Sequence, residues 1–484
     1  MNYKSGMLKR VQNDFGSRSK KALIPRKGRI RLFLLISAAL VAFKLYLLYA
    51  GKADAVNAEA RKIQKKSAAK TGKLLPEKKQ ESPAQFASNQ KLHGGRLSRQ
   101  EVRSFLSRTL PDFDKGIDTL QSKRTKVAVH STIDTNLQKF GHRLFRRYHP
   151  RYGALVAVHP VSGKILSLIS YTHDSMPSLG NDLYLKNMYP AASIFKTIAA
   201  AAFIEHRGYK PETMLRQAGR NHTLYHFQLE RELNQFREIS LQDAFAYSIN
   251  PVFGRTAIHF LGEDPLQEYA GRFGFEEPVP FDLPVDTSRV LKCDSAFNIA
   301  ELASGFNQRT RLTPVLGALI GAAISEDGVM PVPYAIDSLV SIANGKSIYT
   351  AKAAVWKKSI NDVTALHLRR LMISVARYGT ARSAFRYMKR SFRFENVEYG
   401  GKTGSVDKDE LGKTDWFVGF ARHKTDARQR IAVGVVTVHN ENWTVHSSVL
   451  GAEIMRRYIR SIQIADKKRQ KLAEAASDSA LSDG

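Results

Sequence analysis

A serine and a lysine three residues apart are the first pair in this chain that could do chemistry. Ser193 and Lys196 would share one face of a helix, because residues i and i+3 are neighbours on a helix surface. The apolar run 197–204 follows them directly and favours a helix. We therefore expect Ser193 on the first turn of a buried helix, where free backbone N–H groups and the helix dipole favour a hydroxyl that becomes an alkoxide.

Two further short motifs follow along the chain. Ser248-Ile249-Asn250 lies 55 positions after Ser193, and Lys402-Thr403-Gly404-Ser405 lies 154 positions after Ser248. Isolated copies of the same patterns also occur, with their first residues at Ser17, Ser67, Lys70 and Ser359. The first three copies lie in polar, lysine-rich stretches, and Ser359 is expected in an exposed turn before a helix. We interpret all of these copies as solvated surface.

In their order, the three motifs resemble those of the penicillin-binding proteins, the serine transpeptidases of bacterial cell walls. The surrounding sequence adds to the resemblance, which covers roughly residues 125 to 462. The segments that carry it are 132–138, 153–167, 239–253, 308–314, 379–381 and 416–420. Ala192 and Ser405 depart from the Gly and Thr that the family often has, but neither change removes a needed group.

The resemblance implies a role for each motif residue. Ser193 would be the acylated nucleophile, and Lys196 its base, which requires an uncharged amine. Burial and the second cation Lys402 would both lower the Lys196 pKa. Ser248 would relay a proton to the leaving amine, and Asn250 would bind the substrate amide. The remaining residues of the last motif would hold the terminal carboxylate of D-Ala-D-Ala and let the backbone approach it: Lys402, Thr403, Gly404 and Ser405.

Apolar runs predict the elements that must position these residues. Strands are expected at 127–129, 155–158, 166–169, 399–406, 415–422 and 431–438, and helices from about 193 to 324, at 363–378 and at 448–464. Strands at both ends with helices between them indicate one sheet assembled from distant segments. The expected fold class is α/β (α+β), an antiparallel sheet flanked by helices plus a helical subdomain, as in the penicillin-binding and β-lactamase-like transpeptidases.

The N-terminal part has a different composition. Residues 1–29 are predicted to be a basic cytoplasmic tail, and 30–50 a transmembrane signal anchor of about the length that crosses a bilayer. Residues 51–124 are predicted to be a stalk and linker with a short helix that begins at a Ser98–Glu101 capping box. The transpeptidase domain is expected at 125–464 and a disordered tail at 465–484. Because the family works outside the membrane, we expect a single-pass protein of the plasma membrane with a periplasmic domain.

Composition limits the partners. The net charge is +31, yet no nucleic-acid-binding motif accompanies it, and an anionic membrane surface and wall polymer explain the charge equally well. The single cysteine excludes an intrachain disulfide, and the histidines, including His222, show no metal-ligand spacing, so no metal or other cofactor is expected. The expected ligands are peptidoglycan stem peptides and β-lactams. No glycosyltransferase domain fits before residue 125, which leaves a separate glycosyltransferase or division and elongation proteins as partners.

Two alternatives to a D,D-transpeptidase stay open at this point. A D,D-carboxypeptidase would use the same site and transfer the acyl group to water. A non-catalytic β-lactam sensor or scaffold would only bind wall peptides or partners. The segment 230–234 resembles the loop of class A β-lactamases that positions the deacylating water, but it precedes Ser248 instead of following it, so we interpret it as a helix-surface coincidence.

Overall fold

The computed structural model describes residues 97–121, 126–391, 394–409 and 411–482. These residues belong to one compact unit, Leu92–Gly484. The predicted tail at 1–29, the predicted anchor at 30–50 and most of the predicted stalk at 51–124 lie outside the described residues. Within the described ranges, no helix has the length and apolar character needed to span a bilayer.

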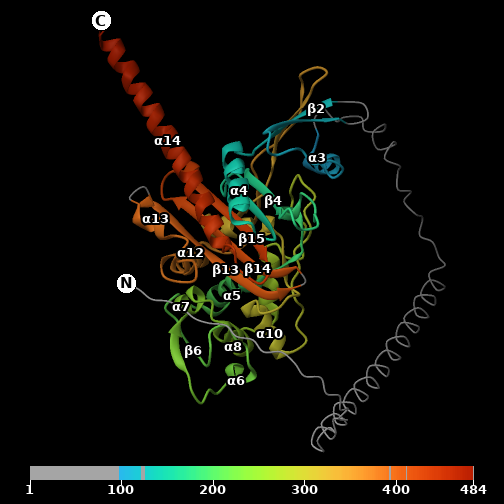
Figure 1. Cartoon of the computed structure of the whole chain (residues 1–484). Coiled ribbons are helices and arrows are strands. Elements are labelled where there is room, and N and C mark those ends of the chain that lie inside the picture. The colour runs from blue at the N-terminus through green and yellow to red at the C-terminus, as the bar shows by residue number, and fades with distance from the viewer. Residues whose placement is uncertain (1–96, 122–125, 392–393, 410, 483–484) are drawn as a thin grey trace, which may run out of the picture. The chain divides into compact units, whose positions relative to one another are not determined.

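The centre of the unit is a five-stranded antiparallel sheet in the order β13-β14-β15-β3-β4 (Figure 1). Its strands are β3 (Tyr152–Val158), β4 (Ile165–Thr172), β13 (Val397–Asp409), β14 (Gly412–His423) and β15 (Arg430–His439). β15 pairs with β3, so the sheet joins segments that are nearly 300 residues apart along the chain. The predicted assembly of one sheet from both ends of the domain is therefore confirmed.

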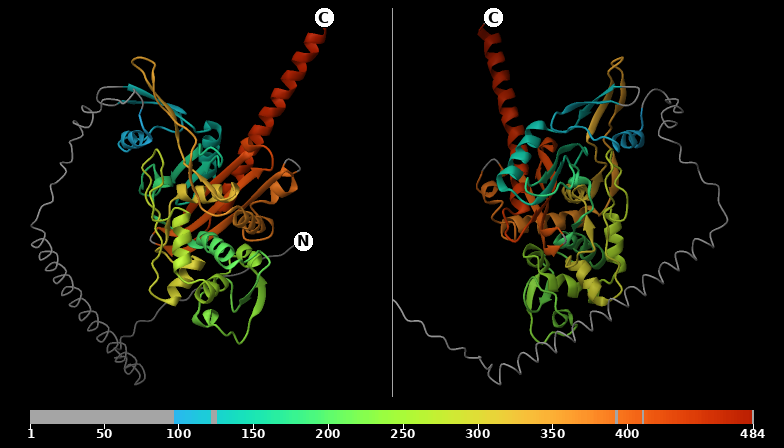
Figure 2. Two further views of the ribbon diagram at one scale, coloured as in Figure 1. Left: turned by 180° about the vertical axis from the view of Figure 1, so that it is seen from behind. Right: turned by 45° about the vertical axis from the view of Figure 1, so that its right-hand side comes forward.

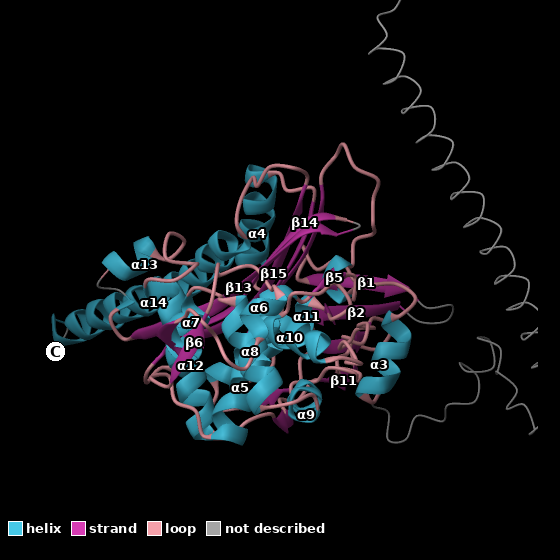
Figure 3. Ribbon diagram, turned by 90° about the horizontal axis from the view of Figure 1, so that it is seen from below, coloured by secondary structure: helices cyan, strands magenta, loops and turns pink. Residues whose placement is uncertain are grey.

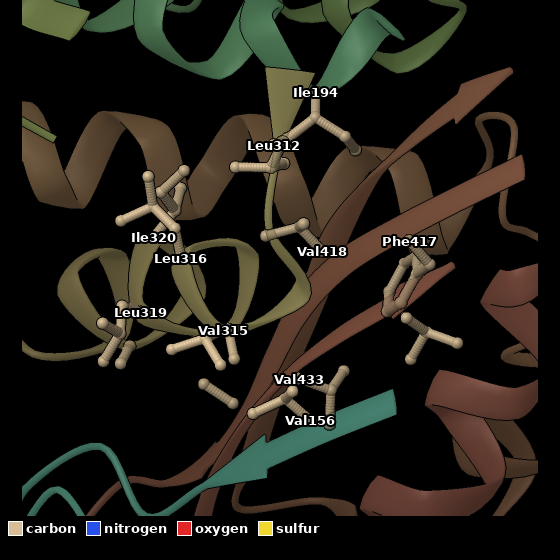
Figure 4. Close-up of a cluster of buried hydrophobic side chains, with 14 of the residues drawn as sticks. Val156, Ile194, Leu312, Val315, Leu316, Leu319, Ile320, Phe417, Val418 and Val433 are labelled. Carbon is tan, nitrogen blue, oxygen red and sulfur yellow. The ribbon is translucent and has the colours of Figure 1, made fainter. Parts of the chain in front are cut away.

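Helices cover both faces of this sheet. On one face, α11 (Pro314–Ser325) packs so closely that a side chain at Gly317 would meet Val418. On the other face, the backbone of α14 (Ser447–Ser482) lies against Phe417 at Gly451. Val418 and Phe417 are successive residues of β14 and so point to opposite faces. Figure 4 shows apolar side chains of α11 and of the sheet in this core.

A second antiparallel sheet has the order β1-β2-β10-β11. Its strands are β1 (Ile117–Gln121), β2 (Lys126–Ser131), β10 (Ile336–Ser341) and β11 (Ser347–Thr350). The predicted strand at 127–129 is thus present but belongs to this sheet. Figure 2 shows this sheet and the short helix α3 (Arg99–Leu106) at one end of the unit.

The compact unit begins before the predicted boundary at residue 125. Helix α3 has the predicted reciprocal capping box of Ser98 and Glu101, and it buries Val102 and Leu106 completely. β1 then pairs along its whole length with β2. Residues from Ser98 onward therefore fold with the domain instead of belonging to the stalk, because α3 contributes side chains to the core.

The segment between β4 and β9 (Val329–Pro331) contains most of the helices that the sequence predicts between the strands of the central sheet (Figure 3). Its main helices are α5 (Lys196–Arg207), α7 (Leu241–Ala246), α8 (Asn250–Phe260), α9 (Asp264–Arg272), α10 (Ala296–Ser304) and α11. Smaller elements complete it: β5 (Tyr189–Pro190), β6 (Met214–Gln217), α6 (His226–Leu229), β7 (Arg237–Ser240) and β8 (Arg311–Leu312). The hairpin of β6 and β7 interrupts the expected helical run.

The remaining elements are α4 (Thr135–Tyr148), β12 (Val355–Lys358), α12 (Asp362–Arg377) and α13 (Arg386–Arg390). Two predictions need correction here. Ser359 is fully buried, not in an exposed turn, and its backbone N–H donates to the backbone oxygen of Gly328 at 2.8 Å. The final helix, expected to end near residue 464 before a disordered tail, continues as α14 to Ser482.

Candidate active site

Ser193 lies on a turn of 3₁₀ helix, η3 (Ala192–Phe195), that runs directly into α5. The sequence predicted that Ser193 lies on the first turn of an α-helix, whereas the structure has a tighter 3₁₀ turn at this place. Ala192 has a φ of +50°, a left-handed conformation that is uncommon for a residue with a side chain. The neighbouring residues are buried while Ser193 is partly exposed, so the turn presents this hydroxyl to solvent.

The Lys196 amine is completely buried and has three polar neighbours. Its Nζ lies 2.8 Å from Ser193 Oγ, 2.7 Å from Asn250 Oδ1 and 2.6 Å from the backbone oxygen of Ser304. A neutral amine has two N–H donors and one lone pair. The amide and carbonyl oxygens can take the two donors, which leaves the lone pair for the proton of Ser193. Burial, and then the charge of Lys402, hold the pKa of Lys196 well below its usual value.

Lys402 provides the second cation at the same place, as predicted. Its Nζ donates to Ser248 Oγ at 2.9 Å and to the backbone oxygen of Thr403 at 2.7 Å. Burial lowers the pKa of Lys402 to about 7. Ser248 has a φ of +56° and is buried in the turn between α7 and α8, where its hydroxyl accepts from Lys402. The structure therefore brings the three predicted motifs together in one site.

Strand β13 lies against the nucleophile turn at Gly404. A Cβ at this position would be 3.1 Å from Ser193 N and 3.2 Å from both Ala192 Cβ and Ile194 N. Only a glycine allows the two backbones to approach so closely. The approach places the Ser193 N–H beside the strand that carries Ser405, which is the arrangement that two backbone donors to an oxyanion need.

Trp416 fixes the nucleophile turn to the central sheet. Its indole Nε1–H donates to the backbone oxygen of Pro190 at 2.8 Å, and its ring meets Tyr189 edge to face. Both aromatic side chains are fully buried. Because Trp416 is the cross-strand partner of Gly404, one buried side chain ties β5, β13 and β14 together.

The hydroxyls of the last motif have partners that the motifs did not predict. Thr403 Oγ1 lies 2.6 Å from Thr380 Oγ1, and Ser405 Oγ donates to Asp415 Oδ1 at 2.8 Å. The contact with Asp415 can be deduced from strand register, because the predicted strands at 399–406 and 415–422 form a hairpin in which Ser405 pairs with Asp415. Thr380 lies in the segment 379–381 that contributed to the resemblance.

Three further residues contribute to the site, and the motifs did not identify them. Ser304 contributes a backbone oxygen, so its side chain gives no indication of the contact. Gly305, with a φ of +68°, packs so tightly that a Cβ there would lie 1.9 Å from the oxygen of Ala192. His222 hydrogen-bonds the backbone of Ser248, and burial and then the charges of Lys196 and Lys402 lower its pKa. The sequence analysis considered this histidine only as a possible metal ligand and did not connect it with the site.

The segment 230–234 forms a loop after α6 and not a helix surface. The guanidinium of Arg255 on α8 donates to the backbone oxygens of Glu230 and Arg231, and the Glu230 side chain is exposed. The expectation of a helix was therefore wrong, and the interactions of this segment are structural.

A lysine amine within hydrogen-bond distance of a serine hydroxyl, next to a strand that carries two further hydroxyls, defines a serine acyl-transfer site. The family profile of the penicillin binding protein transpeptidase domain matches residues 153–459, and the chain belongs to this family. The chain is 25% identical to the peptidoglycan D,D-transpeptidase PbpA of Mycolicibacterium smegmatis over 303 residues, which cover 56% of this chain and 59% of that protein. It is 23% identical to the stage V sporulation protein D of Bacillus subtilis, covering 71% of this chain and 55% of that protein.

The chain thus spans less than two thirds of the length of these two relatives. Similarity to PbpA of Mycobacterium tuberculosis extends further, with 25% identity over 74% of this chain and 76% of that protein. The crystal structure of the M. tuberculosis protein superposes with a TM-score of 0.54 at 24% identity, covering 69% of this chain and 80% of that chain. A D,D-transpeptidase domain from Eggerthella lenta gives 0.56 at 22% identity, covering 69% and 83%. These structures share the fold, and the predicted fold class is confirmed for the described residues.

Proposed function

We propose that this protein is a penicillin-binding D,D-transpeptidase that cross-links peptidoglycan stem peptides through an acyl-enzyme on Ser193. The observation that carries the proposal is the environment of Lys196. A buried amine with a lowered pKa lies 2.8 Å from a partly exposed hydroxyl, and its other neighbours are uncharged oxygens. Such an amine can accept the serine proton near neutral pH.

In the first half of the reaction, the Ser193 proton passes to Lys196 Nζ while Oγ bonds to the carbonyl carbon of the penultimate D-Ala. The oxygen of this carbonyl becomes negatively charged and accepts from the N–H groups of Ser193 and Ser405. The C–N bond then breaks, and the terminal D-Ala leaves after its nitrogen gains a proton. Ser248 is suited to deliver that proton, because its hydroxyl accepts a hydrogen bond from Lys402.

In the second half, the amine of a second stem peptide attacks the ester carbon. As the new amide bond forms, the ester C–O bond breaks and Lys196 returns its proton to Ser193 Oγ. The proton that the amine loses passes to Ser248 and replaces the one given to D-Ala. Asn250 holds the substrate in both halves: its Oδ1 is engaged by Lys196, which leaves the amide N–H₂ for a substrate carbonyl. The names of the relatives, which are peptidoglycan D,D-transpeptidases, support this substrate class.

The acyl donor is expected to bind along β13. Lys402, Thr403 and Ser405 offer a cation and two hydroxyls for the terminal carboxylate, and Gly404 keeps the strand close to Ser193. Acyl-enzyme complexes with imipenem and penicillin G have been solved for penicillin-binding protein A of M. tuberculosis. We propose that β-lactams acylate Ser193 in the same way.

We also propose that the catalytic domain works outside the cytoplasm on a single-pass anchor in the plasma membrane. The apolar run within 30–50 and the location of the proposed substrate support this placement. A separate glycosyltransferase or division and elongation proteins are the proposed partners. Fractionation of cells that express the full chain, followed by protease treatment of spheroplasts, tests the placement: a domain degraded only after the cytoplasm is opened would refute it.

The reaction is tested with a fluorescent penicillin and then with a stem pentapeptide plus an amine acceptor. Ser193→Ala should abolish covalent labelling, whereas Ser67→Ala, which alters another S-x-x-K copy, should label like the parent. Equal labelling of Ser193→Ala excludes Ser193 as the nucleophile. With the pentapeptide, an amine adduct supports transpeptidation, and release of D-Ala without an adduct supports the carboxypeptidase. Labelling with no turnover at all would indicate a sensor or scaffold.

A further inference from the structure

A row of polar side chains crosses the central sheet behind Ser405. Ser405 on β13 pairs with Asp415 on β14, and Asp415 pairs with Thr437 on β15, so the three side chains lie side by side on one face. Asp415 and Thr437 are buried, while Ser405 reaches the surface. The row therefore connects an exposed hydroxyl of the proposed carboxylate-binding strand to a buried carboxylate.

The Asp415 carboxylate is held firmly in place. Its Oδ2 accepts from the backbone N–H of Ser447 at 2.6 Å, and the Ser447 hydroxyl donates to the Asp415 backbone oxygen at 2.7 Å. Ser447 begins α14, where a negative charge is favoured by the helix dipole. The other oxygen, Oδ1, accepts the Ser405 hydroxyl at 2.8 Å and has the imidazole of His446 3.6 Å away.

This arrangement limits what Ser405 can offer a ligand. A serine hydroxyl has one proton, and here that proton points to Asp415. The oxygen then presents only lone pairs to the cleft, and a ligand carboxylate also has only lone pairs. To donate to a ligand, the hydroxyl must rotate and leave Oδ1 of a buried carboxylate without its donor, which is costly.

His446 is placed to remove that cost. Its side chain is 61% exposed, and its Nδ1 lies 3.6 Å from Asp415 Oδ1. The interaction with Asp415 raises the pKa of His446, so its protonated form persists closer to neutral pH. A protonated imidazole can supply the donor that the rotating hydroxyl withdraws.

We propose that Asp415 and His446 form a positioning pair that sets the direction of the Ser405 hydroxyl. Through it, the pair controls how tightly the strand 402–405 binds the anionic end of an acyl donor. The pair is expected to favour anionic ligands when His446 is protonated. This inference rests on the proposed function, because it takes this strand as the carboxylate-binding element.

The other charged and titratable groups around the pair differ in position or behaviour. His439, buried on β15, donates to or accepts from Thr437 Oγ1 at 2.9 Å, and burial lowers its pKa to about 4, so it stays neutral where His446 titrates. Trp443 lies between the two imidazoles, with ring centroids 5.1 Å from His439 and 5.6 Å from His446. Lys413 donates to the backbone of Glu441 and approaches Trp443, on the solvent side.

The test uses the full chain in detergent and two probes: penicillin G, whose carboxylate is charged, and its methyl ester, in which that group is neutral. The acylation rate constant is measured for both between about pH 5 and about pH 8, the window in which a histidine titrates. In the parent, the acid-to-ester ratio should rise as the pH falls. His446→Gln should remove up to about fivefold of that rise, since a partly exposed ion pair contributes little more. His206→Gln, an exposed histidine near the end of α5, should behave like the parent.

Ser405→Ala separates positioning from general damage. If His446 acts through the Ser405 hydroxyl, then adding His446→Gln to Ser405→Ala should change the ratio no further. An equal loss in both backgrounds, or a parent ratio that does not depend on His446, overturns the inference. Failure of the parent to react with either probe would instead refute the proposed function, so the two failures are distinguishable.

Discussion

Replacing Gly404 by alanine tests whether the close approach of β13 to the nucleophile turn matters for acylation. The new Cβ would lie 3.1 Å from Ser193 N and 3.2 Å from Ala192 Cβ and Ile194 N. Ordinary contacts of a methyl group begin near 3.5 Å, so the strand and the turn must separate by a few tenths of an ångström. Two of the three atoms belong to the backbone, so no flexible side chain can move aside.

The size of the effect follows from this displacement. A misplacement of about 1 Å can cost about a hundredfold in rate, so a few tenths should cost roughly five- to tenfold. The fold itself should tolerate the change, because overpacking by one methyl group costs about 1 to 3 kcal/mol. We therefore expect Gly404→Ala to slow acylation by a fluorescent penicillin, while its unfolding midpoint falls by only a few degrees.

Gly271→Ala is the matched control. Gly271 lies near the end of α9, and a Cβ there meets nothing within 4 Å. This variant should acylate at the parental rate. If Gly404→Ala also acylates at the parental rate, the approach of β13 to η3 does not position reacting groups, and the argument for the oxyanion site fails. A loss in both variants would mean that the assay reports general destabilisation.

Three further changes have defined outcomes. Burial lowers the pKa of Lys402 to about 7, against about 10.4 in the unfolded chain, so the unfolded state binds more protons between these two pH values. The free energy of unfolding should therefore rise with pH across this window by about 1.4 kcal/mol per pH unit, and less steeply in Lys402→Met. Urea titrations at several pH values measure this slope, and identical slopes for the two proteins would contradict the prediction. Trp416→Phe leaves the Pro190 carbonyl without its donor and should lower the free energy of unfolding in urea by about 1 to 3 kcal/mol. Trp356→Phe should lower it by less, because the Trp356 indole donates to the more exposed Glu277. Equal losses would refute the role of the buried hydrogen bond. Ser98→Ala removes the N-cap of α3 and should lower the free energy of unfolding by about 1 kcal/mol. The control Ser104→Ala, at an exposed position of the same helix, should leave it unchanged. Equal free energies of unfolding for the two variants would show that α3 does not depend on its cap.

The central sheet could be predicted from the sequence because its strands are nearly continuous apolar runs. β3 is buried at every position, which is the pattern of a strand covered on both faces. The strand at 127–129 was predicted correctly but placed in the wrong sheet. Its burial alternates along β2, as expected for a strand with one face towards solvent, and that alternation already distinguished it from β3.

The site was predicted in its side chains but not in its backbone. Ser193, Lys196 and Lys402 carry their chemistry in the residue type, so the motifs locate them. The carbonyl of Ser304 and the tight packing of Gly305 depend on how α10 ends beside η3, and no residue type encodes that juxtaposition. Asp415 is an intermediate case, because its role follows from strand register once the hairpin is recognised.

Successive side chains of β13 point to opposite faces of the strand, and this separates the buried lysines from the Asp415 carboxylate. Lys196 can act as a base only if its pKa stays low, and a carboxylate within about 4 to 6 Å would raise that pKa. In the described part of the chain, burial and then the charge of Lys402 lower the pKa of Lys196, burial alone lowers the pKa of Lys402, and no acidic group opposes either shift. The nearby carboxylate, Asp415, pairs with Ser405, three residues after Lys402 and therefore on the opposite face of the strand. The strand thus holds Lys402 on the face away from the Asp415 carboxylate, and it holds Ser405, whose hydroxyl donates to that carboxylate, on the other face.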